Sequence, residues 1–94
     1  MFNDYEIIKT ASYIDRSKQR KEIVKILSND SFKKPSDLAK ELDIRTNHVS
    51  RVLKDLKEEQ IVICVNEEEK RGRLYRLTDK GKDAYDFIMN NIEK

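Results

Sequence analysis

Residues 35–60 read PSDLAKELDIRTNHVSRVLKDLKEEQ, and this stretch decides the fold. Pro35 suits the first position of a helix over residues 35–42, because its ring fixes φ and its missing N–H is not needed there. A second helix is predicted over residues 46–59, where apolar residues recur at the spacing of one helix face, namely Val49, Val52, Leu53 and Leu56. Only the short link DIR separates the two helices. Two helices joined by so short a turn indicate a helix-turn-helix.

The chain before this pair contains one more clear helix. Residues 16–29 include Ser17 as a suitable N-cap and an apolar stripe that begins at Ile23, so a helix is expected there. Residues 1–15 form an N-terminal extension whose segment 5–14, YEIIKTASYI, fits two structures. Its isoleucine spacing favours a helix, whereas its β-branched residues and tyrosines are also typical of a strand.

The chain after the pair predicts a β-hairpin over residues 61–78. Two segments rich in β-branched and aromatic residues, IVICVN and RLYRLT, flank the polar stretch EEEKRG. Thr78 then suits the N-cap of a C-terminal helix over residues 79–92. The whole chain, residues 1–94, is therefore expected to form a single domain that is mainly α with a small β-hairpin wing (α+β), a winged helix-turn-helix.

Composition limits the functions open to the chain. The net charge is only +2, and a single cysteine and a single histidine cannot build a cysteine-rich metal site within one chain. No pattern typical of a catalytic nucleophile with its base, or of a phosphate-binding loop, is present, so we expect no enzyme, no cofactor and no metal. No apolar run is long enough to span a membrane, which predicts a soluble cytoplasmic protein with no membrane partner.

The outward face of residues 46–59 is polar and basic over its first two turns, behind an expected N-cap at Thr46. Asn and Arg side chains can pair with base edges in a DNA major groove, while Ser and Lys reach phosphates. An ordinary solvated helix face is the alternative interpretation. The DNA-contacting residues predicted from this helix and its start are Arg45, Thr46, Asn47, His48, Ser50, Arg51 and Lys54.

The tip of the hairpin concentrates positive charge in the segment KRGR, where like charges repel one another unless a polyanion relieves them. A DNA backbone would do so, and arginine also enters narrow minor grooves. The alternative is a hairpin kept polar to discourage edge-to-edge association, with the glutamates at 67–69 pairing these cations. The DNA-contacting residues predicted from the wing are Lys70, Arg71, Gly72 and Arg73.

The segment PSDLAKELDIRTNHVSRVLKDLKEEQIV, followed by KRGRLYRLTDKGKD, resembles winged helix-turn-helix transcriptional regulators. The similar classes are the multiple-antibiotic-resistance (MarR-like) and arsenical-resistance (ArsR-like) regulators and their archaeal relatives. The resemblance covers roughly Arg16 to Tyr85 and implies a recognition helix beginning at Thr46 and a DNA-contacting wing around residues 71–73. It also implies that the pair Ser50 and Arg51 is directed to DNA.

Two positions depart from the pattern of that family. Asp43 stands in the turn where glycine is usual, and Gln60 stands before the strand where glycine is common. Aspartate tolerates a left-handed backbone fairly well, whereas glutamine does so less readily. The departures therefore bear on the geometry at the end of the recognition helix.

Double-stranded DNA is the expected partner, read by a homodimer, because one winged helix contacts few base pairs. Apolar residues outside the helix-turn-helix either form the dimer interface or complete the core, and the sequence favours neither. A winged helix used as a protein-interaction module is the alternative function, and RNA binding is a weaker third, because interleaved aromatic residues are missing. The sequence identifies no small-molecule effector. The interface residues predicted for a dimer are Tyr5, Ile8, Tyr85, Ile88 and Ile92.

Overall fold

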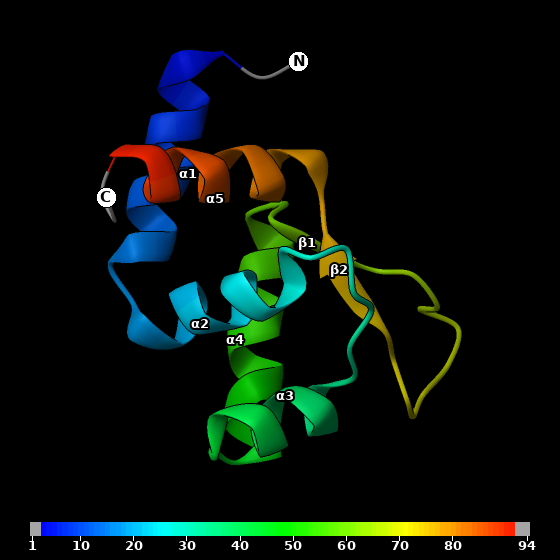
Figure 1. The fold of residues 1–94 in the computed structure, drawn as a ribbon. Helices are drawn as coiled ribbons and strands as arrows, with labels where there is room; N and C mark the ends of the chain where they lie inside the picture. The colour runs from blue at the N-terminus through cyan, green and yellow to red at the C-terminus, as the bar shows by residue number, and fades with distance from the viewer. Residues whose placement is uncertain (1–2, 92–94) are drawn as a thin grey trace.

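The computed structural model describes residues 3–91, which form five helices and one two-stranded sheet. At one end of the molecule α1 and α5 cross, at the other lie α3 and the start of α4, and the hairpin loop projects to the side (Figure 1). None of the helices in residues 3–91 is long and apolar enough to cross a membrane. The elements in chain order are α1 Asp4–Asp15, α2 Lys18–Leu27, α3 Pro35–Leu42, α4 Thr46–Glu58, β1 Val62–Cys64, β2 Tyr75–Leu77 and α5 Asp79–Asn91.

The helix starts follow the capping residues, with one correction. The Ser17 hydroxyl accepts a hydrogen bond from the Arg20 N–H at 3.3 Å, and Pro35 is the first residue of α3, as the sequence predicts. The prediction that Thr46 caps α4 is wrong. Arg45 occupies the N-cap position with extended backbone angles, and its carbonyl accepts from the N–H groups of His48 and Val49 at 3.1 Å each. Thr46 is therefore the first helical residue, because its own backbone already turns with the helix.

The N-terminal extension is a helix rather than a strand. The helix α1 begins behind Asn3, whose side-chain oxygen accepts from the Glu6 N–H at 2.8 Å. Its buried face, which includes Ala11 and Ile14, packs mainly against α5 and secondarily against α2. The isoleucine spacing of this segment was thus the better guide than its β-branched composition.

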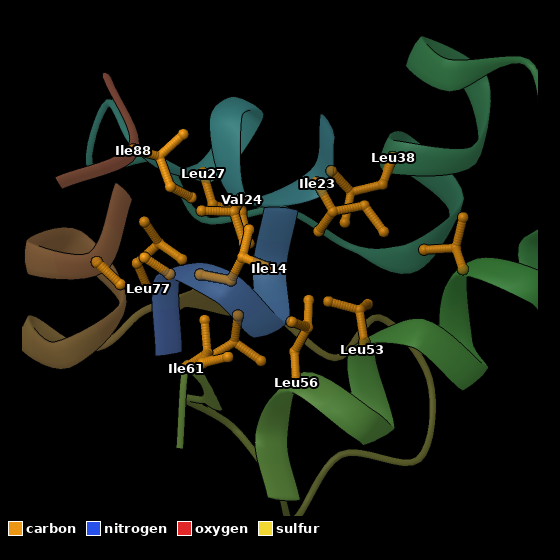
Figure 2. Packing of buried hydrophobic residues seen from close by; sticks show 14 of the residues in the cluster. Ile14, Ile23, Val24, Leu27, Leu38, Leu53, Leu56, Ile61, Leu77 and Ile88 are labelled. Atoms are coloured by element: carbon orange, nitrogen blue, oxygen red, sulfur yellow. The ribbon is translucent and has the colours of Figure 1, made fainter. Parts of the chain in front are cut away.

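The core lies where all five helices and the base of the hairpin meet (Figure 2). It includes Ile88 of α5, which is fully buried, so the prediction that Ile88 belongs to a dimer interface is corrected: this side chain completes the core of its own chain. Ile92 lies outside the described residues. The fully buried large side chains are Ile14, Ile23, Val24, Leu27, Leu38, Val49, Leu53, Leu56, Ile61, Val62, Leu77 and Ile88.

The sheet is an antiparallel ribbon in which Val62 lies opposite Leu77 and Cys64 opposite Tyr75. The far side of β2 also has a partner that the sequence did not predict. Lys33 and Tyr75 exchange two backbone hydrogen bonds, with N···O distances of 3.1 and 2.9 Å. This single bridge holds the segment before α3 against the wing.

Both positions that depart from the family pattern have left-handed backbones. Asp43 ends α3 with φ 55° and ψ 47°, and Gln60 follows α4 with φ 61°. Beyond each, the next N–H reaches back to the preceding helix: Ile44 to Ala39 at 3.1 Å, and Ile61 to Leu56 at 2.9 Å. These bonds satisfy carbonyls at the helix ends, as a glycine terminator would. Both turns therefore take the left-handed conformation that glycine favours, with Asp43 and Gln60 in its place.

Gly81 in the first turn of α5 allows this helix to approach the end of α4. A Cβ at this position would lie 2.4 Å from the Ile61 carbonyl oxygen, closer than any normal contact. We predict that Gly81→Ala lowers the free energy of unfolding by about 1–2 kcal/mol, because overpacking outweighs the gain in helix propensity. Urea unfolding followed by circular dichroism measures the change. Asp86→Ala, on the exposed face of the same helix, is the control, and equal stabilities of the two variants would contradict the prediction.

Candidate nucleic-acid interface

The helix α4 separates a buried apolar face from an exposed polar face. Val49, Leu53 and Leu56 are fully buried, which turns the polar residues of this helix to solvent. His48 is the exception among the predicted contacts, because it is half-buried and lies with Gln19 and Ile44 in a shallow depression. The exposed residues of the predicted set are Arg45, Thr46, Asn47, Ser50, Arg51 and Lys54.

A groove of about 650 Å³ runs between the start of α3, the exposed face of α4 and the wing. It brings together the two regions that the sequence singled out, because Thr46, Ser50 and Lys54 line one side and residues 70–73 line the other. Arg45, Asn47, His48 and Arg51 do not line it and lie elsewhere around α4. Six cations and no acidic residue line the groove within residues 3–91, and they are Lys34, Lys54, Lys57, Lys70, Arg71 and Arg73.

Sequence reasoning missed five lining residues, namely Lys34, Pro35, Ser36, Lys57 and Tyr75. Lys57 had a signal, because it follows Ser50 and Lys54 at helical spacing on the same face. Lys34 had none in its local sequence. It reaches the groove because the bridge between Lys33 and Tyr75 holds its segment beside the wing.

The start of α3 adds a further positive contribution to this groove. Pro35 and Ser36 are the first residues of the helix, whose N-terminus carries a partial positive charge. The side chain of Lys34 extends toward the wing, and its Cδ lies 3.7 Å from the point that a Cβ on Gly72 would occupy. Helix dipole and lysine therefore act on the same space.

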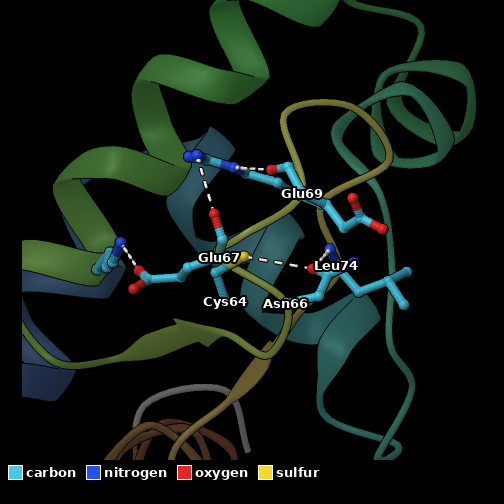
Figure 3. A network of polar contacts seen from close by, with 7 residues as sticks. Cys64, Asn66, Glu67, Glu69 and Leu74 are labelled. Carbon is cyan, nitrogen blue, oxygen red and sulfur yellow. Dashed lines mark hydrogen bonds and ion pairs between the residues drawn. The ribbon is translucent and has the colours of Figure 1, made fainter.

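The wing loop is closed by its own polar groups (Figure 3). The Asn66 side-chain oxygen accepts from the Leu74 N–H at 2.7 Å and from the Cys64 thiol at 3.5 Å. The amide nitrogen of Asn66 donates to the Gly72 carbonyl at 3.2 Å, and Gly72 has a φ of 67°. One asparagine thus connects both arms of the loop and its tip.

Arg73 is turned into the loop rather than held out from it. Its Nε donates to the Glu69 carbonyl at 2.7 Å, and one terminal nitrogen donates to the Glu67 carbonyl at 3.2 Å. The side chain is half-buried, whereas Lys70 and Arg71 are exposed. A guanidinium has five N–H groups, so Arg73 braces the loop and still presents donors to the groove that it lines.

The glutamates of the wing do not neutralise its tip. The Glu67 carboxylate pairs with the ammonium of Lys57 on α4, while Glu68 and Glu69 form no ion pair with any residue in 3–91. The hydrogen bond and charge of Lys57 lower the pKa of Glu67, with a smaller contribution from Arg73. The hydrogen bond to Glu67 in turn raises the pKa of Lys57. The alternative that the glutamates at 67–69 form ion pairs with the cations of the segment 70–73 is therefore wrong for residues 3–91.

The described residues contain no group of three or more His, Cys, Asp or Glu side chains placed to hold a metal ion. Cys64 is half-buried in β1. What the geometry offers is a cationic groove beside an exposed polar helix, an arrangement suited to a polyanion.

The fold and this groove define a winged helix-turn-helix DNA-binding domain. The family model for bacterial regulatory proteins of the arsR family matches residues 17–63, from the cap of α2 into β1. The chain belongs to the ArsR family. The resemblance to winged helix-turn-helix regulators that was inferred from the sequence is therefore confirmed.

Solved structures share the fold at low sequence identity. A mutant of ZitR from Lactococcus lactis superposes with a TM-score of 0.70 at 20% identity, over 82% of this chain and 53% of that one. NadR, solved in complex with 4-hydroxyphenylacetate, gives a TM-score of 0.69 at 19% identity, over 89% of this chain and 63% of that one. The chain thus spans between about half and two thirds of these relatives. No curated protein sequence matches it.

We predict that Asn66→Ala loosens the wing without unfolding the domain. The Leu74 N–H loses its acceptor, so its amide hydrogen should exchange roughly five- to tenfold faster, as expected for a lost hydrogen bond. Native-state hydrogen exchange measured by NMR gives this rate. Asn66→Asp keeps an acceptor oxygen and should protect Leu74 better than Asn66→Ala, and equal exchange in both variants would argue against the proposed closure.

Proposed function

We propose that the chain is a sequence-specific regulator of transcription that places α4 in the DNA major groove and its wing on the adjacent backbone or minor groove. The observation that carries the proposal is the groove itself: it joins α4 to the wing, and among residues 3–91 its lining has cations but no carboxylate. A phosphate backbone is the polyanion that fits such a groove beside an exposed helix. The proposal places the protein in the cytoplasm.

The exposed face of α4 supplies two kinds of contact. Asn47 and Arg51 lie outside the groove on the exposed part of the helix, where Asn can pair with adenine and Arg with guanine. Ser50, Lys54 and Lys57 line the groove, so they are assigned to the phosphate strand that it receives. Base reading and backbone binding thus fall on neighbouring strips of one helix.

The wing holds the other side of that strand. Lys70 and Arg71 are exposed at the tip and are assigned to phosphate or to the minor groove. Arg73 supports them by bracing the loop, and it is itself one of the residues that line the groove. Lys34 and the N-terminus of α3 complete the anion-binding surface.

The contact assignments predict different losses for Arg51→Ala and Arg71→Ala. Duplexes selected from a random pool serve as the probe, and fluorescence anisotropy across a salt series measures binding. Arg51→Ala should weaken the free energy of binding to the selected duplex by about 1–3 kcal/mol and reduce the preference for one base at one position of the site. Arg71→Ala should weaken binding to all duplex sequences by a similar factor. It should also reduce, by about one, the slope of the logarithm of the binding constant against the logarithm of the salt concentration.

Lys25→Ala is the control for these two variants, because Lys25 lies on α2 beside Met89 of α5, away from the groove. It should bind as the parent does. Salt-insensitive or absent duplex binding by the folded parent would favour the protein-interaction function instead. If the folded parent instead prefers single-stranded RNA to duplex DNA, RNA binding would be the favoured function.

We further propose that the regulator acts as a homodimer joined through α1 and α5. Tyr5 and Ile8 on α1 are 71% and 46% exposed, and Met89 on α5 is 44% exposed, although all three are apolar or aromatic. These helices cross at the end opposite α3 (Figure 1). Tyr85 is half-buried at the edge of the core. Pairing there would leave two recognition helices free for half-sites about 34 Å apart.

The dimer predicts a change of mass in the double variant Tyr5→Ser, Ile8→Ser. Sedimentation equilibrium should give a dimer for the parent and a larger monomer fraction for the variant, since burial of these side chains drives association. Val65→Ser is the matched control, because Val65 is 44% exposed in the stem of the wing. A monomeric parent, or equal dissociation in both variants, would contradict this interface.

A further inference from the structure

We infer that Glu67 is an internal competitor of DNA: its carboxylate occupies the ammonium of Lys57 in the free protein and releases it when a phosphate arrives. The inference rests on the proposed function, because it concerns the groove assigned there to the DNA backbone. It makes Glu67 a residue that sets the affinity for duplex without touching it.

The first support is the position of Lys57. Its side chain lines the groove on the same face of α4 as Ser50 and Lys54. Among residues 3–91, Lys57 forms an ion pair, whereas the other five cations of the groove form none. The side chains of Lys57 and Glu67 are 43% and 53% exposed. An ion pair so accessible to water is held weakly, so a polyanion can displace the carboxylate.

The second support is that hydrogen bonds within the loop fix the backbone of Glu67 near α4. Arg73 donates to the backbone carbonyl of Glu67 at 3.2 Å, and the adjacent Asn66 bonds both to Leu74 and to Gly72. Figure 3 shows the Glu67 carboxylate directed toward α4, away from the rest of the loop. Its side chain is therefore free to leave Lys57 while the backbone bonds keep the wing closed.

The consequence is a groove with one latent cation. In the free protein five of the six groove cations lack a carboxylate partner among residues 3–91, and Lys57 has Glu67. Binding to duplex replaces an internal ion pair with a phosphate contact, which lowers the net gain from Lys57. Removing the carboxylate should add one full phosphate contact, which appears as a steeper dependence of affinity on salt.

A general field effect would also strengthen binding when any glutamate is removed, and Glu68 separates the two explanations. Glu68 is the next residue in the same loop, is exposed, and has no ion pair within residues 3–91. Glu68→Gln changes the net charge by the same amount as Glu67→Gln. Unlike Glu67→Gln, this change leaves Lys57 paired with Glu67.

The test compares the parent, Glu67→Gln, Glu68→Gln, Lys57→Met and the double variant Lys57→Met, Glu67→Gln on one selected duplex across a monovalent salt series. Glu67→Gln should bind the duplex about three- to tenfold more tightly than the parent near 0.1 M salt, and its affinity should fall more steeply with salt, by about one in the logarithmic slope. Glu68→Gln should change affinity less than about twofold with an unchanged slope. In the Lys57→Met background, Glu67→Gln should also change affinity less than about twofold.

Unchanged affinity in Glu67→Gln, an equal gain in Glu68→Gln, or a gain that persists without Lys57 would each overturn the inference. Failure of the parent to bind any duplex would instead overturn the proposed function, so the two failures are distinguishable. Leu74 amide exchange checks that the wing stays closed in Glu67→Gln. If it opens, Glu67→Ala is measured in the same cycle, because Arg73 bonds to the backbone at this position and not to the side chain.

Discussion

The carbonyl of Ile61 is the point at which the recognition helix, the wing and the last helix are fixed to one another. It accepts the Thr78 N–H at 3.0 Å and the Thr78 hydroxyl at 3.2 Å, and α5 approaches so closely that only glycine fits at position 81. The left-handed Gln60 turns the chain from α4 so that this carbonyl faces the second strand. Because Ile61 is itself fully buried, a shift at this point would disturb the core and tilt the wing relative to α4 at the same time. The geometry of the groove between α4 and the wing therefore depends on a backbone contact made by residues that are not themselves assigned to DNA.

A second backbone contact sets the other wall of the groove. The bridge between Lys33 and Tyr75 makes β2 the shared strand between β1 and the segment that leads into α3. Lys34 and the positive end of α3 thereby face the wing across the groove. Two such contacts, one on each side of the hairpin, convert a short ribbon of three-residue strands into a fixed partner for α4.

The sequence predicted the parts of this structure that depend on local periodicity. The buried stripe of α4, the cap of α2 and the order of elements follow from spacing and capping chemistry, which act over a few residues. The dimer residue Ile88 was misplaced because periodicity marks it as apolar without saying which chain buries it. Lys34 was missed because its place depends on one distant backbone bridge, and the inward turn of Arg73 was missed because its acceptors are carbonyls that only the closed loop brings together.

A net charge of +2 is small for a protein proposed to bind a polyanion, but the relevant charge is local. Salt screens exposed charges beyond about 8–10 Å, so carboxylates on other faces are largely hidden from a bound phosphate. Neighbouring cations in one groove act together within that distance. Among residues 3–91, Glu67 is the carboxylate that pairs with a cation of the groove, and it lies on the wing rather than on α4. We therefore expect a charge at position 67 to affect DNA affinity more than its share of the total charge, because on our inference it competes with phosphate for the Lys57 ammonium.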